Sequence, residues 1–168
     1  MGLRVSELLG LRCGDIDFDN LTVEIQRSFV QAEIHSTKTE ASESALPLDA
    51  NLADVLLAHR VQAAYATDSD YVFAGDSGKP RWPDSMLADY LKPASVGAGI
   101  GNIGWHTSRH KYSTLLHALG TPLALQKELL RHSDIQTTMN VYTQAVSATK
   151  RRAAEKAQSI LLGKKKTG

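Results

Sequence analysis

The stretch "GWHTSRHKYSTLL", residues 104–116, places two histidines and an arginine on one turn of a predicted helix. His106 and Arg109 are three residues apart and therefore share a face, so two polar, nitrogen-rich side chains project together. His106 and His110 are four residues apart and could hold a metal ion. Two ligands on one helix are a weak metal signal, and the Glu of a zinc-protease motif is missing, so the metal is the weaker interpretation.

Two more candidates flank another predicted helix, in "LLRHSDIQTTMNVYT". His132 follows an apolar turn, the helix is expected to begin at Ser133, and Tyr142 lies at its far end, ten residues after His132. Taken singly, each residue has an ordinary explanation, because such histidines usually cap or pack and such tyrosines are usually half-buried. Only their combination with other motifs indicates a function.

The first third of the chain predicts a helix followed by a small three-stranded antiparallel sheet. "RVSELLGLR" predicts a short helix that ends near Gly14, and "DIDFDNLTVEIQ" alternates apolar and polar residues on both sides of a turn, which predicts a hairpin. "SALPLD" is expected to be the third strand. The polar stretch "STKTEASE" separates it from "RSFVQAEIH" and has the composition of a hairpin tip or loop.

The remaining elements are predicted to be mostly helical. "ANLADVLLAHRVQAA" is expected to form a helix capped by Asp49 or Asn51, "YVFAG" a brief extended segment, and residues 83–92 a helix that Pro93 ends. A glycine-rich linker, "SVGAGIGNIG", then leads to four final helices. On the first of these, an apolar stripe opposite the histidines is expected, made of Tyr112, Leu115, Leu116 and Leu119. The predicted fold class is α+β, mainly α, with the sheet near the N-terminus.

Length and composition favour one globular domain over residues 1–168, with 42% hydrophobic residues. The single cysteine, Cys13, excludes an internal disulfide framework and is expected to fill space in the core. No apolar run reaches the ~20 residues of a membrane span, and no signal peptide is recognisable, so a cytoplasmic location is expected. The net charge is only +1, but basic residues gather in the tail, so one surface can be basic.

Together these motifs resemble the catalytic domain of tyrosine recombinases, the phage-type integrase family. The resemblance extends from Gly2 to about Tyr142 and rests on four motifs in order: "GLRVSEL", His-x-x-Arg, Leu-x-His, and a tyrosine ten residues later. In that family a lysine in the hairpin after the first helix completes the site, and Lys38 lies in a matching context. The site residues that the resemblance implies are Arg4, Lys38, His106, Arg109, His132 and Tyr142, with no cofactor and no metal.

The resemblance implies site-specific recombination of DNA by cleavage and rejoining. Tyr142 would attack a phosphodiester and conserve its bond energy as a 3′-phosphotyrosyl intermediate. Arg4 and Arg109 would clamp the phosphate with planar guanidinium groups, and Lys38 would protonate the departing 5′-hydroxyl. His132 would hydrogen-bond the phosphate, and His106 would assist proton transfer at the tyrosine. Side-chain cations would thus supply the charge that magnesium supplies in many phosphoryl-transfer enzymes.

The expected partners are double-stranded DNA and further copies of the chain, in a tetrameric synapse. Residues 144–168 are expected to form a C-terminal helix followed by a basic tail. The helix carries an apolar stripe of small residues, with which it is expected either to dock on a neighbouring subunit or to pack on its own domain. The family places a DNA-clamping domain and further helices before the Gly-Leu-Arg motif, so an N-terminally truncated domain is expected. An inactive remnant that binds DNA or a partner integrase is the main alternative, and a type IB topoisomerase is the third. Integration, excision and dimer resolution are not distinguished.

Overall fold

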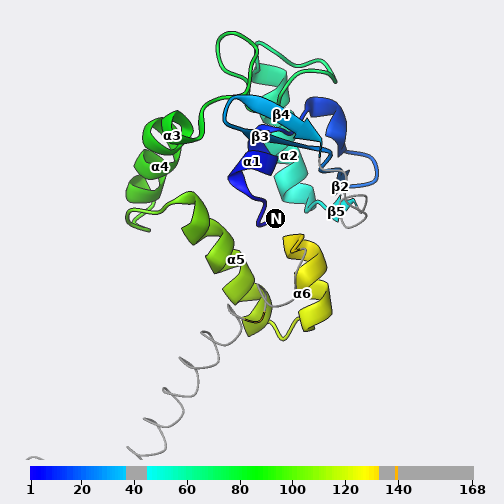
Figure 1. Cartoon of the computed structure of the whole chain (residues 1–168), viewed down its shortest axis with the longest axis vertical. Helices are drawn as coiled ribbons and strands as arrows, with labels where there is room; N and C mark the ends of the chain where they lie inside the picture. Colours follow the sequence, from blue (N-terminus) through cyan, green and yellow to red (C-terminus); the bar gives the residue numbers. More distant parts are fainter. Residues whose placement is uncertain (37–44, 133–138, 140–168) are drawn as a thin grey trace, which may run out of the picture.

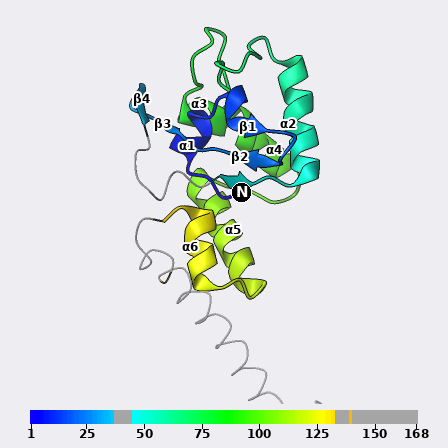
Figure 2. The same ribbon diagram turned by 90° about the vertical axis from the view of Figure 1, so that its right-hand side faces the viewer.

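The computed structural model describes residues 1–36, 45–132 and 139 (Figure 1). Helices predominate over short antiparallel strands, which confirms the predicted fold class. The strands and helices α1 and α2 form one part of the molecule, which we call the sheet part. Helices α5 and α6 lie side by side below it in two perpendicular views (Figures 1 and 2). The N-terminus lies where the sheet part meets α5 and α6. This junction positions the candidate site.

The sheet part begins with helix α1 (Val5–Leu9) and a 3₁₀ turn (Cys13–Asp15). Strands β1 (Ile16–Asp17), β2 (Thr22–Val23) and β5 (Leu46–Pro47) follow and form a three-stranded antiparallel sheet in the order β1-β2-β5. The predicted hairpin and the predicted third strand are therefore confirmed.

Helix α1 ends earlier than the sequence predicts. It stops at Leu9 rather than near Gly14, because the chain must turn away where α1 meets strand β3. A Cβ atom on Gly10 would lie 2.9 Å from the carbonyl oxygen of Arg27, so only glycine allows this close approach.

Strands β3 (Arg27–Val30) and β4 (Glu33–Ser36) form a separate two-stranded sheet, whereas the sequence pattern predicts a single small sheet. They pair as an antiparallel hairpin, and the two residues between them, Gln31 and Ala32, have φ angles of 50° and 68°. Two-residue hairpin turns require such positive φ values, but they usually carry Asn or Gly, so this turn lacks its usual sequence signal.

Helix α2 (Ala50–Gln62) packs on the three-stranded sheet. The Asp49 side chain caps it by accepting hydrogen bonds from the backbone N–H groups of Asn51 and Leu52, as one of the two predicted caps. Cys13 is 3% exposed, and burial raises the pKa of its thiol, in agreement with the predicted space-filling role. The core consists of Leu11, Cys13, Ile16, Val23, Ile25, Leu46, Leu48, Ala53 and Val72.

The segment after α2 differs from the prediction at Pro93. "YVFAG" forms only two isolated bridges, and a helical stretch then runs through α3 (Pro83–Met86), the π-helical turn η3 (Leu87–Leu91) and α4 (Lys92–Gly97). A proline lacks the N–H of a helical hydrogen bond, and its ring clashes with the carbonyl four residues back. Pro93 nevertheless does not end the helix, because the π turn before it changes the backbone register where that clash would occur. The predicted linker is shorter as a result.

Helices α5 (Trp105–Ala118) and α6 (Leu123–Leu130) confirm the first two of the four predicted final helices, and the other two lie outside the described residues. The predicted apolar stripe of α5 is wrong in part. Leu116 is buried, whereas Leu115 and Leu119 are 55% and 72% exposed. Among the described residues, α6 packs along this helix and Trp105 at its start donates to the carbonyl of Pro83 at 3.2 Å, so the predicted stripe is covered only in part. No helix in the described part of the chain is long and apolar enough to cross a membrane.

Candidate active site

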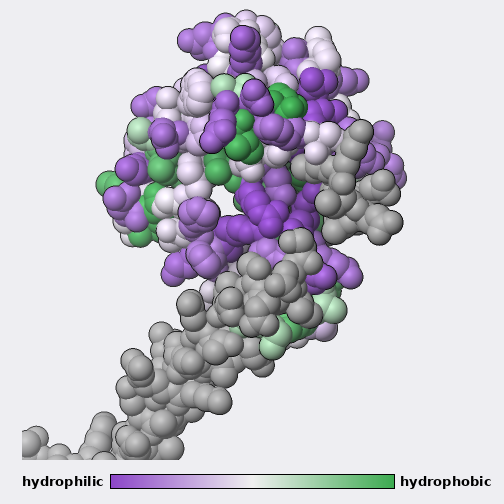
Figure 3. Space-filling model, viewed as in Figure 1, coloured by the Kyte–Doolittle hydropathy of each residue, from purple (hydrophilic) through white to green (hydrophobic). Residues whose placement is uncertain are grey.

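A cavity of about 340 Å³ opens at the junction between the sheet part and the α5–α6 pair. It brings together four of the predicted site residues: Arg4 from the start of α1, His106 and Arg109 from the first turns of α5, and His132 from just after α6. These residues are up to 128 positions apart in the sequence, from Arg4 to His132. Hydrophilic residues gather at the same junction on the surface (Figure 3).

Arg109 is fixed between the two parts of the molecule. Its Nη1 group donates a hydrogen bond to the backbone carbonyl of Gly2, and its Nη2 group donates to the carbonyl of Leu130 at the end of α6. Burial, and next the positive charge of Arg4, lower the pKa of Arg109 to about 10, so the guanidinium remains protonated at neutral pH. A guanidinium has five N–H donors, so these two bonds orient the fork and leave donors for an anion.

Arg4 is held by Glu7 from the next turn of the chain. The Arg4 Nη1 atom lies 3.0 Å from Glu7 Oε1, and the Arg4 backbone N–H donates to Glu7 Oε2 at 2.9 Å. The Arg4 side chain is 43% exposed, whereas that of Glu7 is only 5% exposed. The buried carboxylate thus anchors one edge of the guanidinium, while the rest of the group faces the cavity and solvent.

A third arginine, Arg131, completes this charged cluster. Its Nε atom lies 3.6 Å from Glu7 Oε1, and both side chains are 5% exposed. Arg131 also has a φ angle of 52°, a left-handed conformation that costs a residue other than glycine roughly 1 kcal/mol. Arg4, Arg109 and Arg131 are positive and Glu7 is negative, which leaves a net charge of about +2 around the cavity. This charge favours an anionic ligand, and above all a doubly negative one such as the transition state of phosphodiester cleavage.

His132 is the neutral member of the cluster. It is 7% exposed, and burial, followed by the charges of Arg109 and Arg4, lowers its pKa from 6.5 to about 4. A neutral imidazole carries one N–H donor and one acceptor, so at physiological pH His132 can donate a single hydrogen bond to a phosphate without adding charge.

His106 and the first turn of α5 form the opposite wall. His106 and His110 both line the cavity and are both exposed. The first N–H groups of a helix have no partner within it, and the Gly104 cap has no side chain to satisfy them, so this helix end also favours an anion. The described residues contain no cluster of three or more His, Cys, Asp or Glu side chains that could hold a metal ion.

Two predicted site residues, Lys38 and Tyr142, lie outside the described residues, as does the predicted C-terminal helix and basic tail at 144–168. Their roles therefore stay predictions. Sequence reasoning missed Glu7 and Arg131, which the structure places within the cluster. Glu7 stands inside the quoted Gly-Leu-Arg motif, and Arg131 directly precedes His132, so position next to a motif residue was the available signal.

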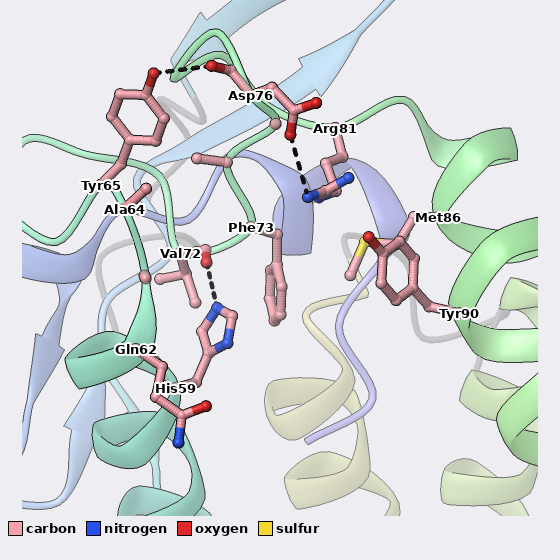
Figure 4. A pocket seen from close by; sticks show the side chains of 13 residues that line it. His59, Gln62, Ala64, Tyr65, Val72, Phe73, Asp76, Arg81, Met86 and Tyr90 are labelled. Carbon is pink, nitrogen blue, oxygen red and sulfur yellow. Dashed lines mark hydrogen bonds and ion pairs between the residues drawn. The ribbon is translucent and has the colours of Figure 1, made fainter.

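A larger cavity, of about 710 Å³, lies elsewhere, between the end of α2, residues 71–81 and η3 (Figure 4). Two of its polar groups bond to the protein itself: His59 Nε2 to the carbonyl of Val72 at 2.8 Å, and the Tyr65 hydroxyl to the carbonyl of Asp76 at 2.9 Å. Aromatic and apolar side chains form much of the remaining wall. Despite its size it lacks the convergent cations of the smaller cavity, so chemistry and not volume identifies the candidate site.

Comparisons with known proteins agree on one family. The sequence profile of the phage integrase family matches residues 1–148. A tyrosine recombinase XerC-like protein of Caldanaerobacter subterraneus subsp. tengcongensis is 31% identical over an alignment of 185 positions, which covers 96% of this chain and 47% of that protein. The integrase of Staphylococcus phage L54a is 25% identical over 175 residues, which cover 95% of this chain and 49% of that protein.

Solved structures share the fold. The integrase of the Tn1549 transposon, in complex with circular intermediate DNA, superposes with a TM-score of 0.71 at 20% identity, over 90% of this chain and 56% of that one. The chain spans about half the length of the curated relatives that it matches. Since the family profile covers most of its length, the chain belongs to the phage integrase family, the tyrosine recombinases that its motifs resemble.

Proposed function

We propose that this chain binds double-stranded DNA and carries out site-specific recombination through a 3′-phosphotyrosyl intermediate. The observation that supports the proposal most directly is the convergence of Arg4, Arg109 and His132 on one cavity, with Arg109 oriented by two backbone carbonyls. A cavity with excess positive charge and a neutral hydrogen-bond donor matches a phosphodiester better than a neutral ligand.

In the proposed reaction, the phenolic oxygen of Tyr142 forms a bond to the phosphorus and the bond from phosphorus to the 5′ oxygen breaks. His106 assists removal of the tyrosine proton, and Lys38 donates a proton to the departing 5′ oxygen. Arg4 and Arg109 stabilise the charge that develops on the non-bridging oxygens. The reverse attack by a 5′-hydroxyl restores a phosphodiester, so no external energy source is needed for rejoining.

The test is the capture of the covalent intermediate. The full chain is incubated with a library of nicked duplexes of randomised sequence, from which the short leaving strand is lost after cleavage, and adducts are separated on a denaturing gel and sequenced. We expect an adduct through Tyr142 with a 3′-phosphate, formed equally with and without EDTA, and none from the Tyr142→Phe variant. An adduct that persists in Tyr142→Phe, or that needs a divalent cation, would overturn the mechanism.

Arginine variants give the matched comparison. Arg109→Ala removes a donor to the developing charge and should slow adduct formation by roughly 10²- to 10³-fold, with a much smaller effect on DNA binding. Arg60→Gln is the control, because Arg60 forms an ion pair with Asp68 at 2.7 Å and a hydrogen bond to the carbonyl of Ala66, away from this cavity. Equal rates for the two variants would refute the role of Arg109. DNA binding by the unmodified chain without any adduct would support a DNA-binding remnant instead.

A further inference from the structure

Arg131 belongs to the charged cluster through its ion pair with Glu7, yet it does not line the cavity. We propose that Arg131 is a positioning residue, which shares the Glu7 carboxylate with Arg4 and thereby sets how Arg4 and His132 meet the phosphate. This inference rests on the proposed function. It assigns a role in the reaction to a residue that touches the phosphate only through its neighbours.

The geometry links three segments that are distant in sequence. The Arg131 Nε atom lies 3.6 Å from Glu7 Oε1, the oxygen that also accepts from Arg4 Nη1 at 3.0 Å. The Nη2 group of Arg131 donates to the carbonyl of Ile25 in the core of the sheet part, at 3.3 Å. Arg131 thus attaches the end of α6 to both α1 and the core.

The charge of Arg131 also changes what Glu7 does to Arg4. A buried carboxylate with one cationic neighbour would bind that neighbour strongly, because the Coulomb interaction is large away from water. With two cations on the same carboxylate, each is held less tightly. Arg4 therefore keeps a fixed edge on Glu7 while its remaining donors stay available for a phosphate.

The backbone of Arg131 contributes separately. Its left-handed conformation, with φ of 52°, ends α6, and the next residue is His132, which enters the cavity. This conformation is disfavoured for any residue other than glycine, and the contacts of the arginine side chain with Glu7 and the carbonyl of Ile25 offset that cost. The same residue consequently positions His132 through the backbone and Arg4 through Glu7.

Three variants separate these contributions. Arg131→Gly keeps and favours the backbone turn but removes the charge. Arg131→Lys keeps the charge but loses the guanidinium contacts. Arg131→Gln removes the charge and keeps much of the length. The matched control is Arg60→Gln. Like Arg131, Arg60 combines an ion pair with a carboxylate and a hydrogen bond to a backbone carbonyl, but it lies outside the cluster.

The first measurement is single-turnover adduct formation at saturating DNA, with the DNA dissociation constant measured in parallel. For Arg131→Gly and Arg131→Gln we expect the rate to fall roughly 10- to 100-fold, less than for a donor that contacts the phosphate directly, while the dissociation constant changes by less than about threefold. Arg131→Lys should recover part of the rate. Variants that fold and cleave like Arg60→Gln would overturn the proposal.

A second measurement does not need catalysis. Inorganic sulfate, compared with chloride at equal ionic strength, should raise the melting temperature of the unmodified chain, and the rise should be lost in Arg131→Gln and kept in Arg60→Gln. If no variant, including the unmodified chain, forms an adduct but the sulfate effect depends on Arg131, then the proposed function fails and the positioning role stands. A sulfate effect that is unchanged in Arg131→Gln refutes the positioning role.

Discussion

The low pKa of His132 predicts a specific loss of stability in mild acid. Its pKa is about 4 in the folded chain, against an ordinary value of 6.5, so between these values the unfolded chain binds a proton that the folded chain does not. Stability therefore rises with pH across this window and is lost as the pH falls. The whole shift of 6.5 minus 4 corresponds to about 3 kcal/mol, and at pH 5 about 2 kcal/mol of it is lost. That loss is substantial for a domain whose total stability is on the order of 5–15 kcal/mol.

The assay is urea denaturation of the unmodified chain and of His132→Gln from pH 7 to pH 4.5. Both proteins also contain carboxylates and other histidines that titrate, so the informative quantity is the difference between their slopes. We expect the unmodified chain to lose about 2 kcal/mol more than His132→Gln between pH 7 and pH 5. His35→Gln is the control, because the His35 side chain is 54% exposed and lies on β4, outside the charged cluster.

Nuclear magnetic resonance gives the direct check, since the imidazole carbon resonances report the protonation of each histidine. Two results would contradict this reasoning: a His132 that titrates near 6.5 in the folded chain, or parallel stability curves for the unmodified chain and His132→Gln. Either would show that burial and the charges of Arg109 and Arg4 do not lower the pKa of His132. The neutral hydrogen-bond donor would then be absent from the site at mildly acid pH.

Two further predictions concern the framework that supports the cavity. Asp15→Asn should lower the free energy of unfolding, measured by urea denaturation, by about 3 kcal/mol. The reason is that Asp15 is 8% exposed and accepts two hydrogen bonds from Arg27 Nη1, at 2.9 and 2.7 Å. A loss below about 1 kcal/mol would contradict a buried ion pair. Gly10→Ala should cost about 1–3 kcal/mol, since its Cβ would lie 2.9 Å from a backbone oxygen, whereas Gly97→Ala, with nothing within 4 Å, should be neutral or stabilising; equal melting temperatures for these two variants would contradict the close approach.

Much of the fold could be predicted from sequence because its signals are local. Alternation around "DIDFDNLTVEIQ" predicts the β1–β2 hairpin, and the apolar spacing and Asp49 cap predict α2. Prediction failed where a local rule was overridden by neighbouring structure. A π turn accommodates Pro93 inside a helix, and a two-residue turn with positive φ forms at Gln31 and Ala32 without the usual glycine.

The candidate site was predicted in part for a different reason. Arg4, Arg109 and His132 were inferred from motifs in order, and the structure brings all three to one cavity. Glu7 and Arg131 could not be inferred in the same way, because their role depends on a contact between α1 and the end of α6. Such a contact between distant segments has no periodic signature in a single sequence.

Two arginines, Arg109 and Arg131, join the α5–α6 pair to the sheet part, and they couple the docking of these two parts to ligand binding in the cavity. Arg109 reaches the carbonyl of Gly2 from α5, and Arg131 reaches the carbonyl of Ile25 from beyond α6, so the groups that hold the joint belong to the same cluster whose positive charges repel one another. An anion in the cavity relieves that repulsion and so tightens the joint. By thermodynamic reciprocity, the factor by which a bound anion favours the closed joint equals the factor by which closing the joint raises the affinity for the anion. Residues far from the cavity can therefore tune anion binding, and amide hydrogen exchange along α6 would slow whenever the cavity is filled.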